Sequence, residues 1–223
     1  MRSTVRGLGH IIPAVIGAVL VLVGIPEGFL KWVLIIAGLF VWLVVDELRL
    51  RIKWRIDRNV VEGPFWTYLA DRYQKVIPWV REKGWLRESE ESGRTTVTLY
   101  CIGLILSLYV FGLTITLWGF LMLGCGDPTA RSMGQGMPVY RFESGPQKGK
   151  SVGGMIGFVL ASLSALFILN MIAFHLGSPL FNPRFFLIQF CGALAGSLAE
   201  LFAGKYDNLA IPLVTGLVMW SLF

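Results

Sequence analysis

Long apolar stretches separated by short polar ones run along most of the chain, which is the pattern of a protein that crosses a membrane several times. A helix needs roughly 20 apolar residues to cross the hydrocarbon core of a bilayer. The first two such stretches, 8–25 and 29–45, are separated only by a Pro-Glu-Gly turn, so they predict a helical hairpin. The first follows a basic start and precedes no small-residue cleavage site, which favours a retained span over a signal peptide.

Residues 46–94 are charged and aromatic at the same time. They contain eleven Lys and Arg side chains and seven aromatic residues between Trp54 and Trp85. This mixture is typical of helices at a membrane interface, where aromatic rings lie at headgroup depth and cations contact anionic lipids. A small soluble domain packed beneath the membrane is the alternative interpretation.

The stretch 95–125 can form one long helix or two short ones joined near Gly112. Charge decides between them, because the cytoplasmic loops of membrane proteins collect Lys and Arg. Two short spans place nearly all of the cations on one side and leave only Lys31 and Arg184 on the other. One span would put the basic segment that follows on the outer side. The charge pattern therefore predicts two spans.

Three more apolar stretches bring the predicted number of spans to about seven. They are 152–174, 185–202 and 209–223. The predicted fold class is an all-α, polytopic membrane helix bundle with interfacial helices between the second and third spans. A content of 55% hydrophobic and 15% charged residues supports this class, because a water-soluble core needs fewer apolar residues. We expect residues 1–223 to form a single integral domain of a cytoplasmic or endoplasmic reticulum membrane, with the N-terminus and both basic segments on the cytoplasmic face.

The Gly-rich segment 126–151 is polar although it adjoins membrane spans, so it needs a functional explanation. It begins with Gly126 and Asp127, and small residues such as Gly134 follow at helical spacing. A carboxylate at the membrane edge is a candidate for a metal or phosphate site, and glycine allows the backbone to approach a phosphate closely. The alternative is that Asp127 caps a helix beginning at Pro128. We interpret the segment as a cytoplasmic nucleotide-binding loop.

The end of this segment carries two cations and a hydroxyl, Lys148, Lys150 and Ser151, at the start of a predicted span. Exposed backbone N–H groups and the helix dipole at such a position also favour an anion. Together with Gly154, these residues predict a triphosphate site. The segment is not a P-loop, because only three residues separate its two glycines where four are needed. The alternative role of both lysines is anchoring at the cytoplasmic face.

Three further oxygen-bearing side chains lie near the same face. Glu200 is close to the inner end of the predicted sixth span, and Asp207 and Asn208 precede the seventh. Carboxylate oxygens are ligands of hard cations, so Asp127, Glu200 and Asp207 are predicted to hold a divalent metal, Mg²⁺ or Ca²⁺. The alternative is that Asp207 or Asn208 caps the last helix. His10, at the inner end of the first span, is a further candidate for catalysis.

In their order and spacing these motifs resemble those of the CTP-dependent lipid kinases, the family of dolichol kinase, phytol kinase and yeast-type diacylglycerol kinase. The resemblance runs nearly end to end and rests on a Gly-Asp step, a Lys-Ser-x-x-Gly step and a Glu followed by Asp-Asn and Pro. The matching residues are Gly126, Asp127, Ala130, Gly134, Lys150, Ser151, Gly154, Glu200, Asp207, Asn208 and Pro212. An Arg-Lys-x-x-His motif near the first span is matched only by Arg6 and His10, with Gly7 in place of Lys.

The resemblance implies transfer of the γ-phosphoryl group of CTP to the hydroxyl of a membrane lipid alcohol, which is a polyprenol such as dolichol, a diacylglycerol or phytol. It implies that Asp127 holds a divalent metal or orients the hydroxyl. It also implies that Lys150 and Ser151 bind the triphosphate. Glu200, with the adjacent Asp-Asn pair of the last span, would complete the metal and acceptor side.

Two other functions share parts of this pattern. A cytidylyltransferase that makes a CDP-activated lipid uses the same nucleotide, metal and membrane geometry, but the chain shows no Asp-Arg-Asp-Ser type of cluster near its C-terminus. A small transporter has carboxylates near the middle of the membrane and often paired halves. Here the acids and lysines gather at one face, and no internal repeat is evident. We expect membrane lipids and CTP as partners, and no nucleic acid.

Overall fold

The computed structural model describes the chain in six stretches, which are residues 15–20, 25–82, 95–137, 139–144, 147–177 and 185–223. Every named element in these stretches is helical, and the one strand-like feature described is a bridge between Arg141 and Ser151. The predicted all-α class is therefore confirmed.

Four of the described helices are long and apolar enough to cross a membrane. They are Glu27–Asp57, Thr96–Gly136, Val152–His175 and Phe185–Ala203. Many large apolar side chains on their outer surfaces are exposed, as contact with lipid requires. These helices support a membrane helix bundle. The count of seven spans stays a prediction, because the last helix is shorter than these four and most of the first predicted span lies outside the described residues.

The first long helix runs without a break from α2 (Glu27–Leu39) through a wider π-helical stretch, η1 (Phe40–Asp46), into α3 (Glu47–Asp57). The predicted change from a span to an interfacial segment at residue 46 therefore does not interrupt the helix. The sequence offers a physical reason, because neither Pro nor Gly occurs between residues 40 and 57. An i,i+4 ion pair between Glu47 and Arg51 adds local support.

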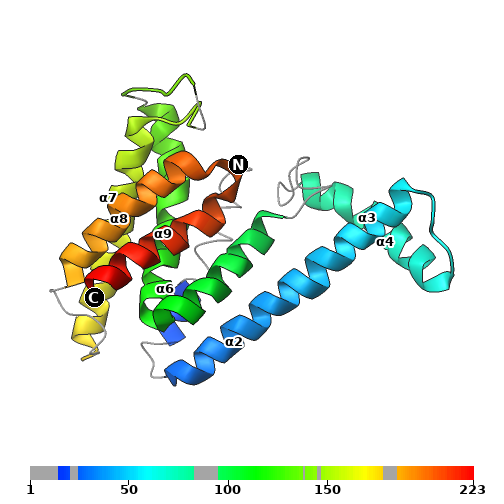
Figure 1. Ribbon diagram of the computed structural model, residues 1–223, viewed down its shortest axis with the longest axis horizontal. Helices are drawn as coiled ribbons and strands as arrows, with labels where there is room; N and C mark the ends of the chain where they lie inside the picture. The colour runs from blue at the N-terminus through cyan, green and yellow to red at the C-terminus, as the bar shows by residue number, and fades with distance from the viewer. Residues whose placement is uncertain (1–14, 21–24, 83–94, 138, 145–146, 178–184) are drawn as a thin grey trace.

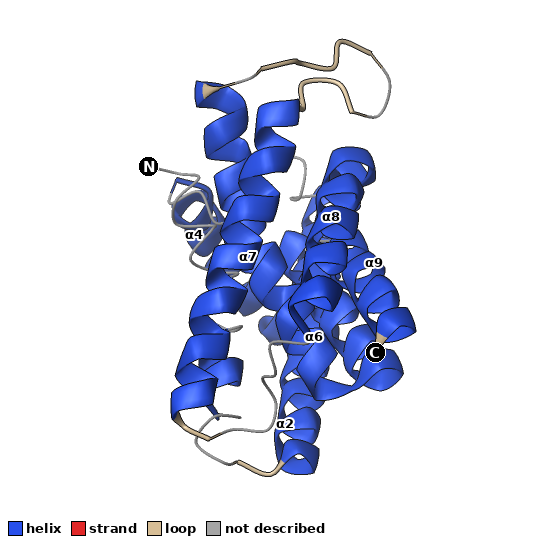
Figure 2. Cartoon of the chain, turned by 90° about the vertical axis from the view of Figure 1, so that its left-hand side faces the viewer, coloured by secondary structure: helices blue, strands red, loops and turns tan. Residues whose placement is uncertain are grey.

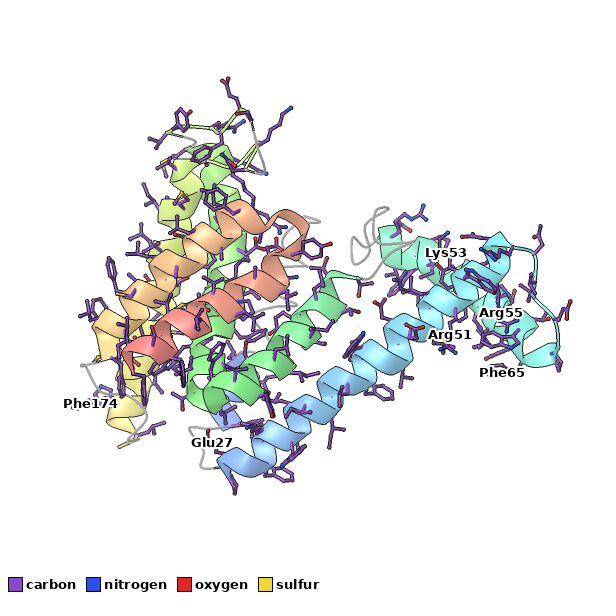
Figure 3. All side chains as sticks on the ribbon, viewed as in Figure 1. Glu27, Arg51, Lys53, Arg55, Phe65 and Phe174 are labelled. Atoms are coloured by element: carbon purple, nitrogen blue, oxygen red, sulfur yellow. The ribbon has the colours of Figure 1, made fainter. Side chains whose placement is uncertain are left out.

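The basic and aromatic segment forms a pair of helices. After a short turn, α4 (Pro64–Glu82) folds back against α3, and the guanidinium of Arg55 lies over the ring of Trp66. Figure 1 shows α3 and α4 extending away from the other helices, and Figure 3 labels Arg55 of α3 and Phe65 of α4 at this end. The predicted helices are confirmed for this part of the segment, and residues 83–94 lie outside the described stretches.

α6 (Thr96–Gly136) consists of two helical halves that meet at Gly112, whose φ of 79° and ψ of 178° are not helical. The predicted hinge at this residue is confirmed, and Figure 1 shows that the two halves point in clearly different directions. The backbone N–H of Leu113, at the start of the second half, donates to Glu27 Oε1 over 3.4 Å. The first turn of α2 therefore supports the bend.

The second half of α6 lies in a bundle with the last three long elements. α6 packs against α7 (Val152–His175) and α9 (Asp207–Leu222), and α8 (Phe185–Ala203) packs against both α7 and α9. A short turn, η2 (Gly204–Tyr206), joins α8 to α9. Figure 2 shows these helices as one bundle with the polar loop at its end. Large buried side chains fill the centre, among them Trp118, Phe120, Met122, Phe158 and Ile211.

Small residues let these helices approach one another closely. A Cβ on Gly196 of α8 would lie 2.7 Å from a methyl group of Thr215 on α9 and 3.0 Å from the ring of Phe158 on α7. Small side chains at helix crossings are typical of membrane proteins, in which packing drives association. Gly196 therefore lets α8 pack closely against α7 and α9.

We expect Gly112→Ala to destabilise the folded protein by about 1 to 3 kcal/mol, because only glycine adopts this combination of φ and ψ without strain. A Cβ at this position would meet no atom within 4 Å, so the change isolates backbone strain. Gly28→Ala is the matched control, since its Cβ also meets nothing within 4 Å and its φ is ordinary. Unfolding midpoints in detergent measure both variants, and equal stability losses would contradict the role given to Gly112.

Candidate functional site

Three buried carboxylates converge at one end of the bundle. Asp127 lies in the last part of α6, Glu200 near the end of α8 and Asp207 at the start of α9. They are only 3%, 3% and 8% exposed, and the charge of Glu200 interacts with the charges of the other two. The structure thus brings together the three residues that were predicted as metal ligands.

Arg131, which the sequence motifs do not single out, joins two of these carboxylates. It lies one turn after Asp127 on α6, and its Nη2 atom is 2.9 Å from Asp127 Oδ2 and 3.9 Å from Asp207 Oδ2. The four-residue spacing is a sequence signal for the first contact. The second contact arises only from the packing of α9 against α6. Arg131 therefore ties these two helices together at the site.

Lys150 pairs with Glu200. Its Nζ atom donates a hydrogen bond to Glu200 Oε1, so a predicted triphosphate ligand and a predicted metal ligand contact each other. Lys150 belongs to the polar loop 137–151, whose two sides pair like strands, with the N–H of Phe142 donating to the Lys150 carbonyl over 3.0 Å. This pairing holds Lys150 close to the end of α8.

The glycines of the predicted motifs have a packing role in the structure. Ser151 caps α7, and the N–H of Gly154 donates to Ser151 Oγ over 3.1 Å. A Cβ on Gly154 would lie 2.9 Å from the carbonyl oxygen of Ala130, and one on Gly134 would lie 2.9 Å from Ser151 Oγ. Gly126 faces an aromatic ring of α7. These glycines let α6 and α7 approach closely, while their contact with a nucleotide stays a prediction.

The remaining predicted residues lie further from the carboxylates or have other partners. Asn208 is buried, and its Nδ2 atom donates to the carbonyl oxygen of Thr96 over 3.3 Å, which joins the start of α9 to the start of α6. Lys148 is exposed in the polar loop. His10 lies outside the described residues.

Within the described residues, no group of three His, Cys, Asp or Glu side chains is arranged to hold a metal ion by itself. The chemistry of the donors still fits a hard cation, because Mg²⁺ is usually held by one or two carboxylates together with water and substrate phosphates. Asp127 and Asp207 form such a pair, since both contact the same cation, Arg131. These two residues would hold a divalent metal in company with the phosphates of a nucleotide.

The surroundings of Asp207, which precedes the predicted last span, disfavour its ionised form. Burial raises the pKa of the Asp207 carboxyl, and the negative charge of Asp127 raises it further. The backbone N–H of Asn208, which donates to Asp207 Oδ1 over 2.8 Å, and the cation of Arg131 oppose this rise only in part. The ionised Asp207 carboxylate therefore lowers the stability of the folded protein.

We expect Asp207→Asn to raise the melting temperature of the protein at pH 7 by on the order of a few degrees. Because folding raises the pKa of Asp207, its ionisation above that pKa opposes folding, and asparagine carries no charge. The difference from wild type should shrink as the pH falls through the pKa of Asp207, where the wild-type carboxyl is protonated as well. Thermal unfolding in detergent at several pH values measures this, and a variant that melts lower at pH 7 would contradict it.

Gly153→Ala should weaken the contact between α6 and α7 at the site. Its Cβ would overlap the backbone carbonyl of Met137, which cannot rotate away as a side chain does. We expect a loss of about 1 to 3 kcal/mol of folding free energy. Gly157→Ala is the control, because the atom nearest to its Cβ would be the Met133 sulfur at 2.8 Å, in a side chain that can rotate. The denaturant midpoints of the two variants measure this effect. Gly157→Ala should lose less folding free energy than Gly153→Ala.

No protein-family model matches the chain, and no curated protein or solved structure matches it either.

Proposed function

We propose that the protein is a CTP-dependent kinase that transfers the γ-phosphoryl group to the hydroxyl of a membrane lipid alcohol, which is a polyprenol, a diacylglycerol or phytol. The observation that carries the proposal is the cluster of three buried carboxylates with Arg131 and Lys150. It lies at one end of helices that are long and apolar enough to cross a membrane. Charged side chains within such helices are costly and usually functional.

The composition of the cluster suits phosphoryl transfer. This reaction asks little covalent chemistry of the protein and mainly requires that the reactants be positioned and the phosphate charge be neutralised. Lys150 and the N-terminus of α7 offer positive charge to a triphosphate. Asp127 and Asp207 offer ligands to a divalent cation, which stabilises the charge on the transferred phosphoryl group when bound.

In the proposed reaction, the oxygen of the lipid hydroxyl forms a bond to the γ-phosphorus. The bond from this phosphorus to the β–γ bridging oxygen breaks, and CDP leaves. We assign Glu200 to the acceptor side, because its carboxylate becomes free when Lys150 turns to the triphosphate. The free carboxylate then accepts the proton of the hydroxyl, as a general base does.

The apolar tail of the acceptor has a surface beside the cluster. Leu194, Leu198 and Phe202 follow one another at four-residue spacing on the exposed side of α8. The small residues of the same helix, such as Gly196, are instead buried against α7 and α9. We therefore expect the tail to lie along the lipid-facing side of α8, with its hydroxyl at the end of the helix near Glu200.

The test is to incubate the purified protein in detergent with γ-labelled CTP, Mg²⁺ and a panel of lipid alcohols. We expect label on one class of alcohol, and a loss of activity of at least about 100-fold in Asp127→Asn, because the proposed divalent cation loses a charged ligand. Asp71→Asn is the matched control. Asp71 also pairs with a cation four residues later, Lys75, but on the exposed surface of α4, so this variant should keep its activity.

A parallel reaction with α-labelled CTP and phosphatidic acid tests the cytidylyltransferase alternative. That enzyme incorporates the cytidine into lipid and releases pyrophosphate, whereas a kinase releases CDP. Label in this reaction and none from γ-labelled CTP would replace the proposed function by the alternative. Folded wild-type protein that labels no lipid in either reaction would overturn both.

A further inference from the structure

Arg131 contacts two carboxylates that come from different helices. Its Nη2 atom lies 2.9 Å from Asp127 Oδ2 and 3.9 Å from Asp207 Oδ2. Both carboxylates are buried, so a positive charge has to stay close to them. In the part of the chain that the structure describes, Arg131 is the one cation that forms ion pairs with them. A divalent cation held by these carboxylates would have to take its position.

The position of Arg131 allows it to leave. Its side chain is 33% exposed, whereas that of Asp127 is 4% exposed, so the guanidinium can turn outward without movement of the helix. The carbonyl oxygen of the preceding residue, Ala130, lies close to Gly154 in the first turn of α7. Arg131 therefore lies beside the helix start at which we propose that the triphosphate binds.

We propose that Arg131 is a placeholder for the divalent cation of the metal–nucleotide complex, an inference that rests on the proposed function. When the cation binds Asp127 and Asp207, Arg131 turns from the carboxylates to the phosphate oxygens. Arginine suits this exchange, because its planar guanidinium forms strong, often bidentate hydrogen bonds with carboxylates and with phosphates alike.

The second ion pair of the site supports the same exchange. Lys150 can leave Glu200 for a phosphate oxygen just as Arg131 leaves its two carboxylates. With the complete metal–nucleotide complex, the metal pairs with Asp127 and Asp207, the phosphates pair with Arg131 and Lys150, and Glu200 is left to accept the hydroxyl proton. A metal alone displaces Arg131 without offering it a phosphate, so the guanidinium competes with the metal. A variant without the Arg131 guanidinium measures how strongly this group competes with the metal.

The test measures the binding of Mn²⁺ to the full chain in detergent without nucleotide, from the electron paramagnetic resonance signal of the free ion. Arg131→Gln removes the competing cation, so Mn²⁺ should bind about tenfold more tightly than to wild type. CTP at saturating Mn²⁺ should bind about tenfold more weakly, because the phosphates lose a contact. Opposite changes in the two affinities distinguish a placeholder from a merely structural residue, whose loss weakens both.

Arg51→Gln is the matched control, because Arg51 pairs with Glu47 at the same four-residue spacing on the exposed surface of α3. It should change neither affinity. An unchanged or weaker Mn²⁺ affinity in Arg131→Gln would overturn the inference, and the kinase would stand if wild type still phosphorylates lipid. Tighter Mn²⁺ binding supports the placeholder role even if wild type phosphorylates no lipid, a result that would reject the kinase instead.

A measurement on wild-type protein makes the test independent of the folding of the variant. Phenylglyoxal modifies accessible guanidinium groups, and mass spectrometry quantifies its reaction with Arg131. Mn²⁺ alone should speed this modification severalfold, and Mn²⁺ with CTP should slow it below the rate without ligands. If Mn²⁺ alone leaves the rate unchanged, Arg131 is not displaced and the inference is wrong.

Discussion

The end of the bundle that carries the site depends on the pairing of five charges. Three buried carboxylates need cations beside them, and these are Arg131 on α6 and Lys150 in the polar loop. Each of the two cations connects separate elements, because Arg131 on α6 reaches α9 and Lys150 in the polar loop reaches α8. Three negative charges against two positive ones leave the cluster with one negative charge in excess. The same pairs that hold the elements together therefore also favour the approach of a further cation.

A second set of polar contacts connects the long N-terminal helix to this end of the molecule. Asp46 is buried, and the hydroxyl of Thr98 in the first turn of α6 donates to its Oδ2 atom. The same turn accepts a hydrogen bond at the carbonyl oxygen of Thr96 from Asn208, the residue that follows Asp207. The start of α6 thus contacts Asp46 through Thr95 and Thr98, and the site through Thr96. Arg49, whose Nη2 atom lies 2.8 Å from Asp46 Oδ1, supplies the cation that a buried carboxylate needs.

Local chemistry allowed much of the fold to be predicted from the sequence. The helical class and the hinge at Gly112 follow from apolar length, charge placement and the conformational freedom of glycine. The long-range partners of the buried charges did not follow, because Lys150 and Glu200 are 50 residues apart and Asp46 and Thr98 are 52 apart. The sequence alone therefore indicates Asp46 only as the first residue of the interfacial segment and Glu200 only as a candidate metal ligand. The grouping of the three carboxylates was predicted from their position at one face, whereas their pairing required the tertiary structure.

Preformed ion pairs also restrict which ligands the site can accept. An isolated anion would draw Lys150 away and leave Glu200 as an unpaired buried carboxylate, and an isolated metal would leave Arg131 without its partners. Each case carries the free-energy penalty of an unpaired charge in surroundings of low dielectric constant. A metal–triphosphate complex would bring both signs of charge at once, so Asp127 and Asp207 would pair with the metal and both cations with the phosphates. Only Glu200 would then be left, to be matched by the hydroxyl of the acceptor. If the proposed function holds, charge pairing within the site would therefore favour the complete complex over free metal and over inorganic phosphate, before any contact with the base or the lipid tail adds to the choice.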